Sequence, residues 1–215
     1  MVTIKGLSPH TELIFDGISQ LECIQPFVLV GGTALSLQLG TRLSEDLEFM
    51  KWRTSKNEKM EVDWPRIKKE LETVGTIEKM DLMDFDHVEF IVNGVKLSFY
   101  ATSRYAPPMN PIRLLNNLKI ADAKAIGVMK MELMLRRSNF RDYYDIYSIL
   151  LSGEDLSDMM RLALEHSEHR LKSKQMLSIL TNSNRFERDS QFEQLSPVYN
   201  VSPMEIENYI KELLK

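Results

Sequence analysis

The sequence predicts an α/β protein of the α+β class, with strands in its first half and helices in its second. Three strand-like runs separated by short turns occupy residues 76–102. A stretch with three prolines, residues 106–111, can continue neither a strand nor a helix. Beyond it the apolar residues recur with the helical period, so we expect helices from there to the C-terminus. The predicted domains are therefore residues 1–106 and 107–215.

The first expected element is an amphipathic helix over residues 9–25. Its apolar side chains recur every three or four residues and form one stripe, which we expect to pack on the sheet. The stripe consists of Leu13, Ile14, Ile18, Leu21 and Ile24.

Residues 27–49 form the segment around which the rest of the prediction is organised. The apolar run 27–30 predicts a buried strand, and the pair Gly31-Gly32 permits a tight turn after it. A short helix is expected next, over residues 33–39. The segment ends in a second strand, which carries acidic residues.

This second strand presents two carboxylates on one face. Side chains two residues apart on a strand point the same way, so Asp46 and Glu48 share a face while Leu47 and Phe49 point to the core. A hard cation such as Mg²⁺ takes oxygen ligands and borrows the rest of its shell from water and substrate phosphates. The two acids are therefore candidate Mg²⁺ ligands.

The glycine pair is a candidate phosphate-binding element. Gly31-Gly32 lets backbone N–H groups approach an anion, and Thr33 opens a helix whose dipole favours negative charge at its start. Together with Asp46 and Glu48, these are the parts of a metal-assisted phosphoryl or nucleotidyl transfer site. The structural alternative is a plain turn followed by a solvated strand face.

The elements that follow have clear local signals. Asp63 is placed to cap a helix with a proline in its first turn, and Asn93-Gly94 is a two-residue hairpin signal. The strands are expected at residues 76–83, 87–92 and 95–102. The helices of the second half are expected at residues 120–137, 140–151, 155–169, 173–180 and 203–214.

The second half also contains a charged group of unusual placement. Lys130 shares the apolar stripe of its helix, and Asp142 and Asp145 lie three residues apart on one face of the next helix. One interpretation is functional. The other is a structural ion pair between Lys130 or Arg141 and these acids, which would tie the two helices together.

Two motifs of the chain resemble those of one protein family. The first consists of Gly31-Gly32-Thr33, Arg42, Ser44 and Asp46-Leu47-Glu48-Phe49. The second runs from Met129-Lys130 to Arg141-Asp142-Tyr143-Tyr144-Asp145-Ile146-Tyr147. Both resemble the motifs of nucleotidyltransferases of the AbiEii/AbiGii toxin family, in the polymerase-beta-like nucleotidyltransferase superfamily. Glu48 stands where Asp is commoner in that family, and the resemblance covers roughly residues 27–150.

The resemblance implies a fold, a reaction and a set of roles. The fold is a nucleotidyltransferase core with a mixed, largely antiparallel sheet, followed by a helical C-terminal domain that contributes to the cleft. The reaction is Mg²⁺-dependent transfer of a nucleoside monophosphate from an NTP to an acceptor hydroxyl. The implied catalytic residues are Asp46, Glu48, Lys130 and Asp142, with Asp46 and Glu48 as the metal ligands. The implied nucleotide-binding residues are Gly31, Gly32, Thr33, Ser44 and Lys130.

The resemblance also implies a biological role, with alternatives. The expected role is that of a toxin in a toxin–antitoxin pair or in phage defence, with RNA such as a tRNA end as acceptor and a separately encoded antitoxin as partner. A small-molecule or protein acceptor is the first alternative, because a net charge of -4 provides no global positive field for nucleic acid. A non-catalytic nucleotide-binding module is the second, because Glu48 replaces Asp and residues 95–99 contain no third acid. Glu89, on the neighbouring strand, is a candidate third carboxylate.

Composition limits the remaining classes. The hydrophobic fraction of 43% and the charged fraction of 27% are ordinary for a soluble globular protein. One cysteine, Cys23, excludes an internal disulfide framework. No apolar run approaches the roughly 20 residues that a membrane helix needs, and the N-terminus lacks a signal-peptide pattern. We therefore expect a cytoplasmic protein with no membrane association.

Overall fold

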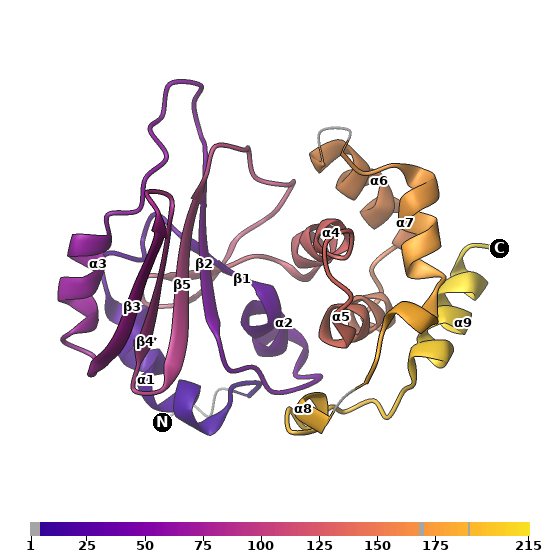
Figure 1. Ribbon diagram of the computed structural model, residues 1–215, viewed down its shortest axis with the longest axis horizontal. Helices are drawn as coiled ribbons and strands as arrows, with labels where there is room; N and C mark the ends of the chain where they lie inside the picture. Colours follow the sequence, from indigo (N-terminus) through magenta and orange to yellow (C-terminus); the bar gives the residue numbers. More distant parts are fainter. Residues whose placement is uncertain (1–4, 168–169, 189) are drawn as a thin grey trace. The chain divides into compact units, whose positions relative to one another are not determined.

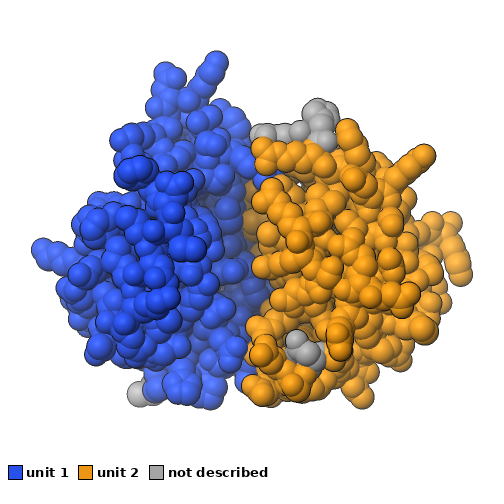
Figure 2. Space-filling model, viewed as in Figure 1, with its two compact units in different colours: residues 1–38, 43–106, 110–122 blue, residues 39–42, 107–109, 123–215 orange. Residues whose placement is uncertain are grey.

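The computed structural model describes residues 5–167, 170–188 and 190–215. The chain divides into two compact units, coloured separately in Figure 2. Unit 1 comprises Met1–Gln38, Leu43–Ala106 and Asn110–Asp122, and unit 2 comprises Leu39–Arg42, Pro107–Met109 and Ala123–Lys215. The predicted boundary after residue 106 is one of the points at which the chain passes between the units, and residues 110–122 then return to unit 1.

Unit 1 is built on a mixed sheet, which has seven strands within the described residues. The strands are β1 (Val28–Val30), β2 (Leu47–Trp52), β3 (Ile77–Asp84), β4 (His87–Val92), β5 (Val95–Thr102), β6 (Ile112–Leu115) and β7 (Leu118–Ile120). Their spatial order is β3-β4-β5-β2-β1-β7-β6. The β2–β5 and β1–β7 pairs are parallel, and the other four pairs are antiparallel. The prediction of a mixed, largely antiparallel sheet is confirmed.

The β4–β5 hairpin shows how local sequence sets the register. Asn93 and Gly94 both have positive φ, 48° and 77°, which a type I′ turn requires at its two central positions. The turn pairs Val92 with Val95, and the register then continues to His87 opposite Tyr100. Both strands and the turn between them are confirmed at the predicted residues.

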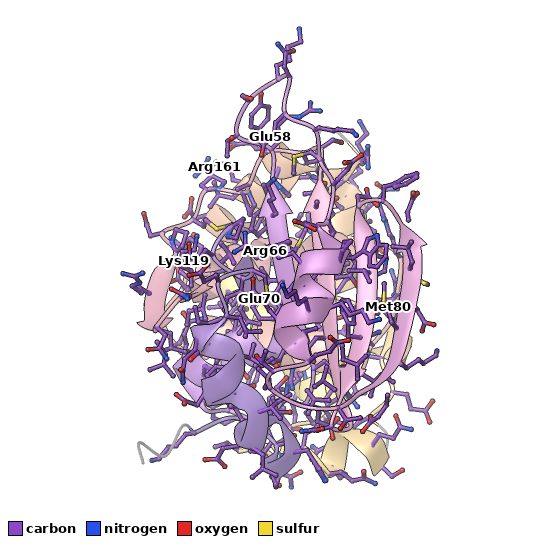
Figure 3. All side chains as sticks on the ribbon, turned by 90° about the vertical axis from the view of Figure 1, so that its left-hand side faces the viewer. Glu58, Arg66, Glu70, Met80, Lys119 and Arg161 are labelled. Carbon is purple, nitrogen blue, oxygen red and sulfur yellow. The ribbon has the colours of Figure 1, made fainter. Side chains whose placement is uncertain are left out.

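Three helices lie mainly in unit 1 among the residues that the structure describes. They are α1 (Pro9–Gln20), α2 (Gly31–Leu39) and α3 (Trp64–Leu71), and in Figure 1 α3 and α2 lie on opposite sides of the sheet. The Asp63 side chain caps α3 by accepting a hydrogen bond from the Arg66 amide, as predicted. Along α3, Arg66 and Glu70 form an ion pair of 2.9 Å on the surface that Figure 3 faces.

The first helix is shorter than predicted, and one residue of its stripe is misplaced. The helix ends at Gln20 because the next residue, Leu21, adopts an extended backbone conformation. Leu13 is 82% exposed, whereas Ile14 and Ile18 are buried. Leu13 fits the helical spacing of the stripe, but the face of the helix that is buried does not include it. The prediction that Leu13 packs on the sheet is therefore wrong.

The expectation that every element after the proline-rich stretch is helical is also wrong. Strands β6 and β7 follow that stretch, and the next helix begins only at Ala123. Strand β7 pairs in parallel with β1, with Leu29 opposite Ile120. Strand β7 has only three residues, of which Leu118 and Ile120 are buried and Lys119 is not. So short a pattern fits a strand and a helix equally well, and the pairing with β1 is what makes the segment a strand.

Unit 2 is helical in its described residues. Its elements are α4 (Ala123–Leu133), α5 (Phe140–Leu151), α6 (Leu156–His166), α7 (Ser173–Leu180), the 3-10 turn η1 (Ser183–Arg185), α8 (Ser190–Glu193) and α9 (Pro203–Leu213). Five of these correspond to the predicted helices, whereas η1 and α8 were not predicted. Part of the helix predicted to reach residue 169 lies outside the described residues. No described helix has the length and apolar character needed to cross a membrane.

Candidate functional site

Asp46 and Glu48, the two candidate metal ligands, lie at the start of the second strand, as predicted. Asp46 directly precedes β2, and Glu48 is the second residue of that strand. Asp46 is exposed and Glu48 partly exposed, whereas Leu47 and Phe49 are buried. The predicted alternation is confirmed, so both carboxylates point away from the apolar core.

The backbone at position 31 favours glycine, and the Glu48 carboxylate lies in the space beside it. The φ of Gly31 is +69°, in the left-handed region that favours glycine. A Cβ atom at this position would also overlap the Glu48 carboxylate oxygen Oε2. The helix α2 begins at Gly31 itself, so the prediction of a separate Gly31-Gly32 turn before a helix at Thr33 is wrong. The bend is made by Gly31 alone, because β1 pairs through Val30 with Glu48 up to the start of the helix.

Thr33 and Ser44 fix the backbone that leads to Asp46. Both side chains are buried, and their hydroxyl oxygens lie 2.8 Å apart in a hydrogen bond. The carbonyl oxygen of Asp46 is a second acceptor within hydrogen-bond reach of the single Thr33 O–H. The Ser44 amide donates to the Gly6 carbonyl at 2.9 Å, and the Ser8 amide to the Ser44 carbonyl at 2.9 Å. The two side chains therefore support the acidic segment from inside unit 1.

The polar face of the sheet continues from Glu48 across two further strands. Glu48 on β2 is paired with Ser98 on β5, which is paired with Glu89 on β4. These three side chains therefore share a face in one row. The Ser98 hydroxyl donates to Glu89 Oε1 at 3.3 Å, and Lys96 Nζ lies 2.8 Å from the same oxygen.

Glu89 is engaged by Lys96, His87 and Ser98. Burial raises the pKa of the Glu89 carboxyl, but hydrogen bonds and charges from Lys96 and His87 outweigh burial and hold it below its ordinary value. Two strand spacings, about 10 Å, separate the backbones of Glu48 and Glu89. Among the described residues, no group of three or more His, Cys, Asp and Glu side chains is placed to hold a metal ion.

Asp46 and Glu48 nevertheless fit a Mg²⁺ ion as a two-carboxylate set. Their donors are oxygen atoms, which Mg²⁺ prefers, and both side chains reach solvent. The Glu48 carboxylate lies against Gly31, where a side chain would displace it. Mg²⁺ usually keeps several waters and substrate oxygens, so two protein ligands are sufficient.

Unit 2 brings Lys130 and Asp142 together. Lys130 on α4 lies 2.8 Å from Asp142 Oδ1 and 2.8 Å from Asp145 Oδ2, and both acids belong to α5. All three side chains are buried. The ion pair that joins two helices, foreseen as the structural interpretation of this group, is therefore present.

Two arginines extend this pair into a chain of five charged side chains, Arg42-Asp145-Lys130-Asp142-Arg137. Arg42 donates from Nε and Nη2 to the two oxygens of Asp145, both at 2.8 Å. Arg137 donates from Nε to Asp142 Oδ2 at 2.7 Å and from Nη2 to Oδ1 at 3.0 Å. Such bidentate pairs are the strong form of charged hydrogen bond.

The charges of this ion chain stabilise one another. Burial raises the pKa of Asp142, but Lys130 and Arg137 outweigh burial and lower it to about 2. Burial likewise lowers the pKa of Lys130, but Asp145 and Asp142 outweigh it and raise that pKa above its ordinary value. Both groups are therefore charged at neutral pH.

Sequence reasoning gave Arg42 no role of its own and did not single out Arg137. Two buried acids on one helix face need more positive charge than one lysine supplies, and this is the signal from which further cations could have been inferred. Which cations meet them is a matter of tertiary structure, since Arg42 and Asp145 are 103 residues apart in sequence.

The mixed sheet, with Glu48 on β2, Asp46 directly before it and Gly31 at the start of α2, has a nucleotidyltransferase fold, which solved nucleotidyltransferase structures share. The chain belongs to the nucleotidyl transferase AbiEii toxin family of type IV toxin–antitoxin systems, whose family model matches residues 12–197. This family is the one that the two sequence motifs resemble, and it makes the chain a nucleotidyltransferase.

Similar proteins cover nearly the whole chain. An uncharacterized protein of Aquifex aeolicus (strain VF5), aq_aa25, is 25% identical over 218 aligned positions, covering 99% of this chain and 98% of that one. The solved structure of MenT4, the nucleotidyltransferase toxin Rv2826c of Mycobacterium tuberculosis H37Rv, is 16% identical with a TM-score of 0.59, covering 96% of this chain and 84% of that one. JHP933 from Helicobacter pylori is 18% identical with a TM-score of 0.54, covering 96% and 93%. At these identities the two structures show a shared fold.

Proposed function

We propose that the protein transfers a nucleoside monophosphate from an NTP to an acceptor hydroxyl in a Mg²⁺-dependent reaction. The hydroxyl oxygen attacks the α-phosphorus, the bond to the β-phosphate breaks, and pyrophosphate leaves while the hydroxyl proton passes to solvent or a base. The observation that supports this best is that Asp46 and Glu48 turn the same way beside the core, with the Glu48 carboxylate against Gly31 at the N-terminus of α2.

The residues of unit 1 are assigned roles by their chemistry. Asp46 and Glu48 would hold Mg²⁺, which when bound neutralises charge on the phosphates. Backbone N–H groups at Gly31, Gly32 and Thr33 would bind a phosphate at the positive end of α2. Ser44 contributes through Thr33, because its side chain is engaged inside the unit.

Lys130 and Asp142 of unit 2 are proposed to take part in the same reaction. Lys130 contributes positive charge that stabilises the phosphates as charge develops on them. The low pKa of Asp142 makes it a weak base, so it orients the cations bound to it rather than removing the proton of the acceptor.

The acceptor and the partner are also proposals. An RNA such as a tRNA end is the proposed acceptor, a separately encoded antitoxin the proposed partner, and the cytoplasm the proposed location. Family membership supports this toxin role. The net charge of -4 favours a small molecule or a protein side chain as the alternative acceptor.

A non-catalytic nucleotide-binding module is the second candidate function. It is favoured by Glu48 in place of the commoner Asp and by the separation between Glu48 and Glu89. Such a module binds an NTP but releases no pyrophosphate.

The test is pyrophosphate release from each of the four NTPs with Mg²⁺, with and without total cellular RNA. Asp46→Ala should abolish release, and Glu45→Ala is the matched control, because Glu45 is the adjacent acid and is also exposed. Release that needs RNA supports an RNA acceptor. Release in Asp46→Ala at the parent rate would show that the site is wrongly assigned.

A further inference from the structure

The connection that follows β2 in unit 1 is basic, although the chain as a whole is acidic. Residues 51–59, the basic segment, contain four Lys and Arg side chains and one carboxylate, whereas the net charge of the chain is -4. In Figure 3 the stretch that carries Glu58 extends beyond the sheet. An acidic protein that binds nucleic acid needs a local positive surface of this kind, because phosphate neutralisation supplies much of the affinity.

Two of the four cations are paired with carboxylates. Lys51 Nζ lies 3.2 Å from Glu58 Oε1, and Lys59 Nζ lies 2.6 Å from Glu61 Oε1. The other Glu58 oxygen accepts hydrogen bonds from the Thr54 amide and hydroxyl, at 2.8 and 2.7 Å. These hydrogen bonds, together with Lys51, lower the pKa of Glu58 to about 2. Glu58 is therefore ionised at neutral pH and engaged by Lys51 and Thr54.

The other two cations, Arg53 and Lys56, have no carboxylate partner within the described part of the chain. Lys56 is exposed, and Arg53 is partly exposed. The Nε atom of Arg53 is shielded from solvent and, among the described residues, finds no hydrogen-bond acceptor. Shielded donors in proteins nearly always have a partner, so this guanidinium is placed for a ligand that brings acceptor oxygens.

Both cations are held in place by the backbone. The Arg53 amide donates to the carbonyl oxygens of Thr102 at 3.2 Å and Arg104 at 3.0 Å, on the chain that leaves β5. Lys56 lies in the turn that Glu58 closes. A ligand that binds here therefore has less backbone freedom to remove than it would on an unsupported loop.

The basic segment and the candidate metal ligands lie at opposite ends of one strand. Asp46 directly precedes β2, and Arg53 directly follows it. Five residues separate Glu48 from Arg53, which corresponds to about 17 Å along a strand. A stacked nucleic-acid strand advances about 3.4 Å per nucleotide. A strand whose end reacts at the two acids would thus reach the basic segment about five nucleotides further along.

We propose that Arg53 and Lys56 bind backbone phosphates of a single-stranded RNA, the acceptor whose end reacts beside the candidate Mg²⁺ ligands. Arginine and lysine are the side chains that neutralise phosphates, and these two have no carboxylate of the described chain to neutralise instead. Their place on the strand that carries the acids favours an acceptor over a protein partner. The identity of this RNA as the acceptor rests on the proposed function, whereas its binding is measured without any reaction.

The experiment measures binding of a fluorescein-labelled, single-stranded RNA of about 12 nucleotides, long enough to span both ends of β2, by fluorescence anisotropy at several salt concentrations. It compares the parent with Arg53→Gln/Lys56→Gln and with the control Lys68→Gln/Lys69→Gln, which removes two exposed lysines of α3 in the same unit. Each phosphate contact contributes about 0.7 to the slope of log affinity against log salt. Loss of two contacts should lower the slope by about 1.4 and weaken binding roughly 10-fold to 30-fold at about 0.1 M salt. The control should change the affinity less than about twofold.

A pair of single variants keeps the test valid if the Arg53 substitution proves unstable on thermal unfolding. Lys56→Gln and Lys69→Gln each remove one exposed lysine. Lys56→Gln should weaken RNA binding about fivefold, the value of one contact at about 0.1 M salt, and Lys69→Gln should leave it unchanged.

Three results would overturn the proposal. The first is equal RNA affinity in the double variant and its control. The second is a parent that binds no RNA, and pyrophosphate release from an NTP in that case would leave nucleotidyl transfer standing with another acceptor. The third is a parent that binds poly-glutamate through the basic segment but not RNA, which would make the segment a site for an acidic protein. The expected RNA binding in a parent that releases no pyrophosphate would support the surface and overturn only the proposed reaction.

Discussion

The Glu48 carboxylate occupies the space that a side chain at Gly31 would fill, so the acid on β2 and the start of α2 interlock. Val30 and Glu48 are paired across the two strands, which brings the helix start and the acid together. Gly31 thus meets a backbone requirement, a positive φ, and leaves the Glu48 carboxylate its place beside the helix start.

Gly31→Ala should destabilise the protein about as much as Gly40→Ala and should also displace Glu48. Both glycines have positive φ, but a Cβ atom at Gly40 meets nothing within 4 Å, whereas one at Gly31 meets the end of the Glu48 side chain, which can move aside. We expect each substitution to reduce the free energy of unfolding by about 1–2 kcal/mol, and Gly31→Ala in addition to weaken Mn²⁺ binding. Urea unfolding and Mn²⁺ titration measure the two effects. Unchanged Mn²⁺ affinity in Gly31→Ala would mean that the position of Glu48 against Gly31 does not matter for the metal.

Lys130→Ala should destabilise the protein strongly. It leaves two buried carboxylates, Asp142 and Asp145, with less positive charge, and breaking a buried pair costs about 3–5 kcal/mol. Lys124→Ala is the control, because Lys124 pairs with Glu154 and Asp158 nearer the surface, where such pairs contribute about 1 kcal/mol or less. Urea unfolding of both variants would contradict this prediction if the two losses were alike.

The stability that Asp142 provides should be lost in acid. Its pKa is about 2 in the folded protein and near 3.8 ordinarily. A carboxyl with a lowered folded pKa stabilises the protein above its unfolded pKa, and that stability disappears as the pH falls through the folded value. The window is therefore about pH 4 down to pH 2.

The measurement for this prediction is the difference in unfolding free energy between the parent and Asp142→Asn. This difference should be constant from pH 7 to about pH 5 and should shrink as the pH falls below 4. A difference that stays constant down to pH 2.5 would show that the Asp142 pKa is not lowered.

Metal binding should depend on Asp46 but not on Glu89. Glu89 is held by Lys96 and lies two strands from Glu48. We expect Asp46→Ala to weaken Mn²⁺ binding at least about tenfold. Loss of a residue that only hydrogen-bonds to a metal ligand already lowers metal affinity by about 10–100-fold. Glu89→Gln should leave the affinity unchanged. Equal weakening in both variants, measured by Mn²⁺ titration, would make Glu89 a third ligand.

Features encoded within a few neighbouring residues could be predicted from the sequence. The alternation that turns Asp46 and Glu48 away from the core depends only on the period of a strand. The β4–β5 hairpin follows from the backbone preferences of Asn93 and Gly94. The family motifs are likewise contiguous stretches, which is why the family was recognised without a structure.

Features that depend on distant partners were decided only by the tertiary structure. Strand β7 forms by pairing in parallel with β1, a segment about 90 residues away in sequence. In α1, the tertiary structure buries Ile14 and Ile18 but leaves Leu13 exposed, although all three fit the helical stripe. Arg42 and Arg137 complete the ion chain because buried carboxylates require compensating charge, and any of the chain's 27 Lys and Arg residues could supply it. Local periodicity thus determined which residues form each element and which faces they turn to the core. Packing and charge compensation, which join residues far apart in sequence, determined which of those faces meet.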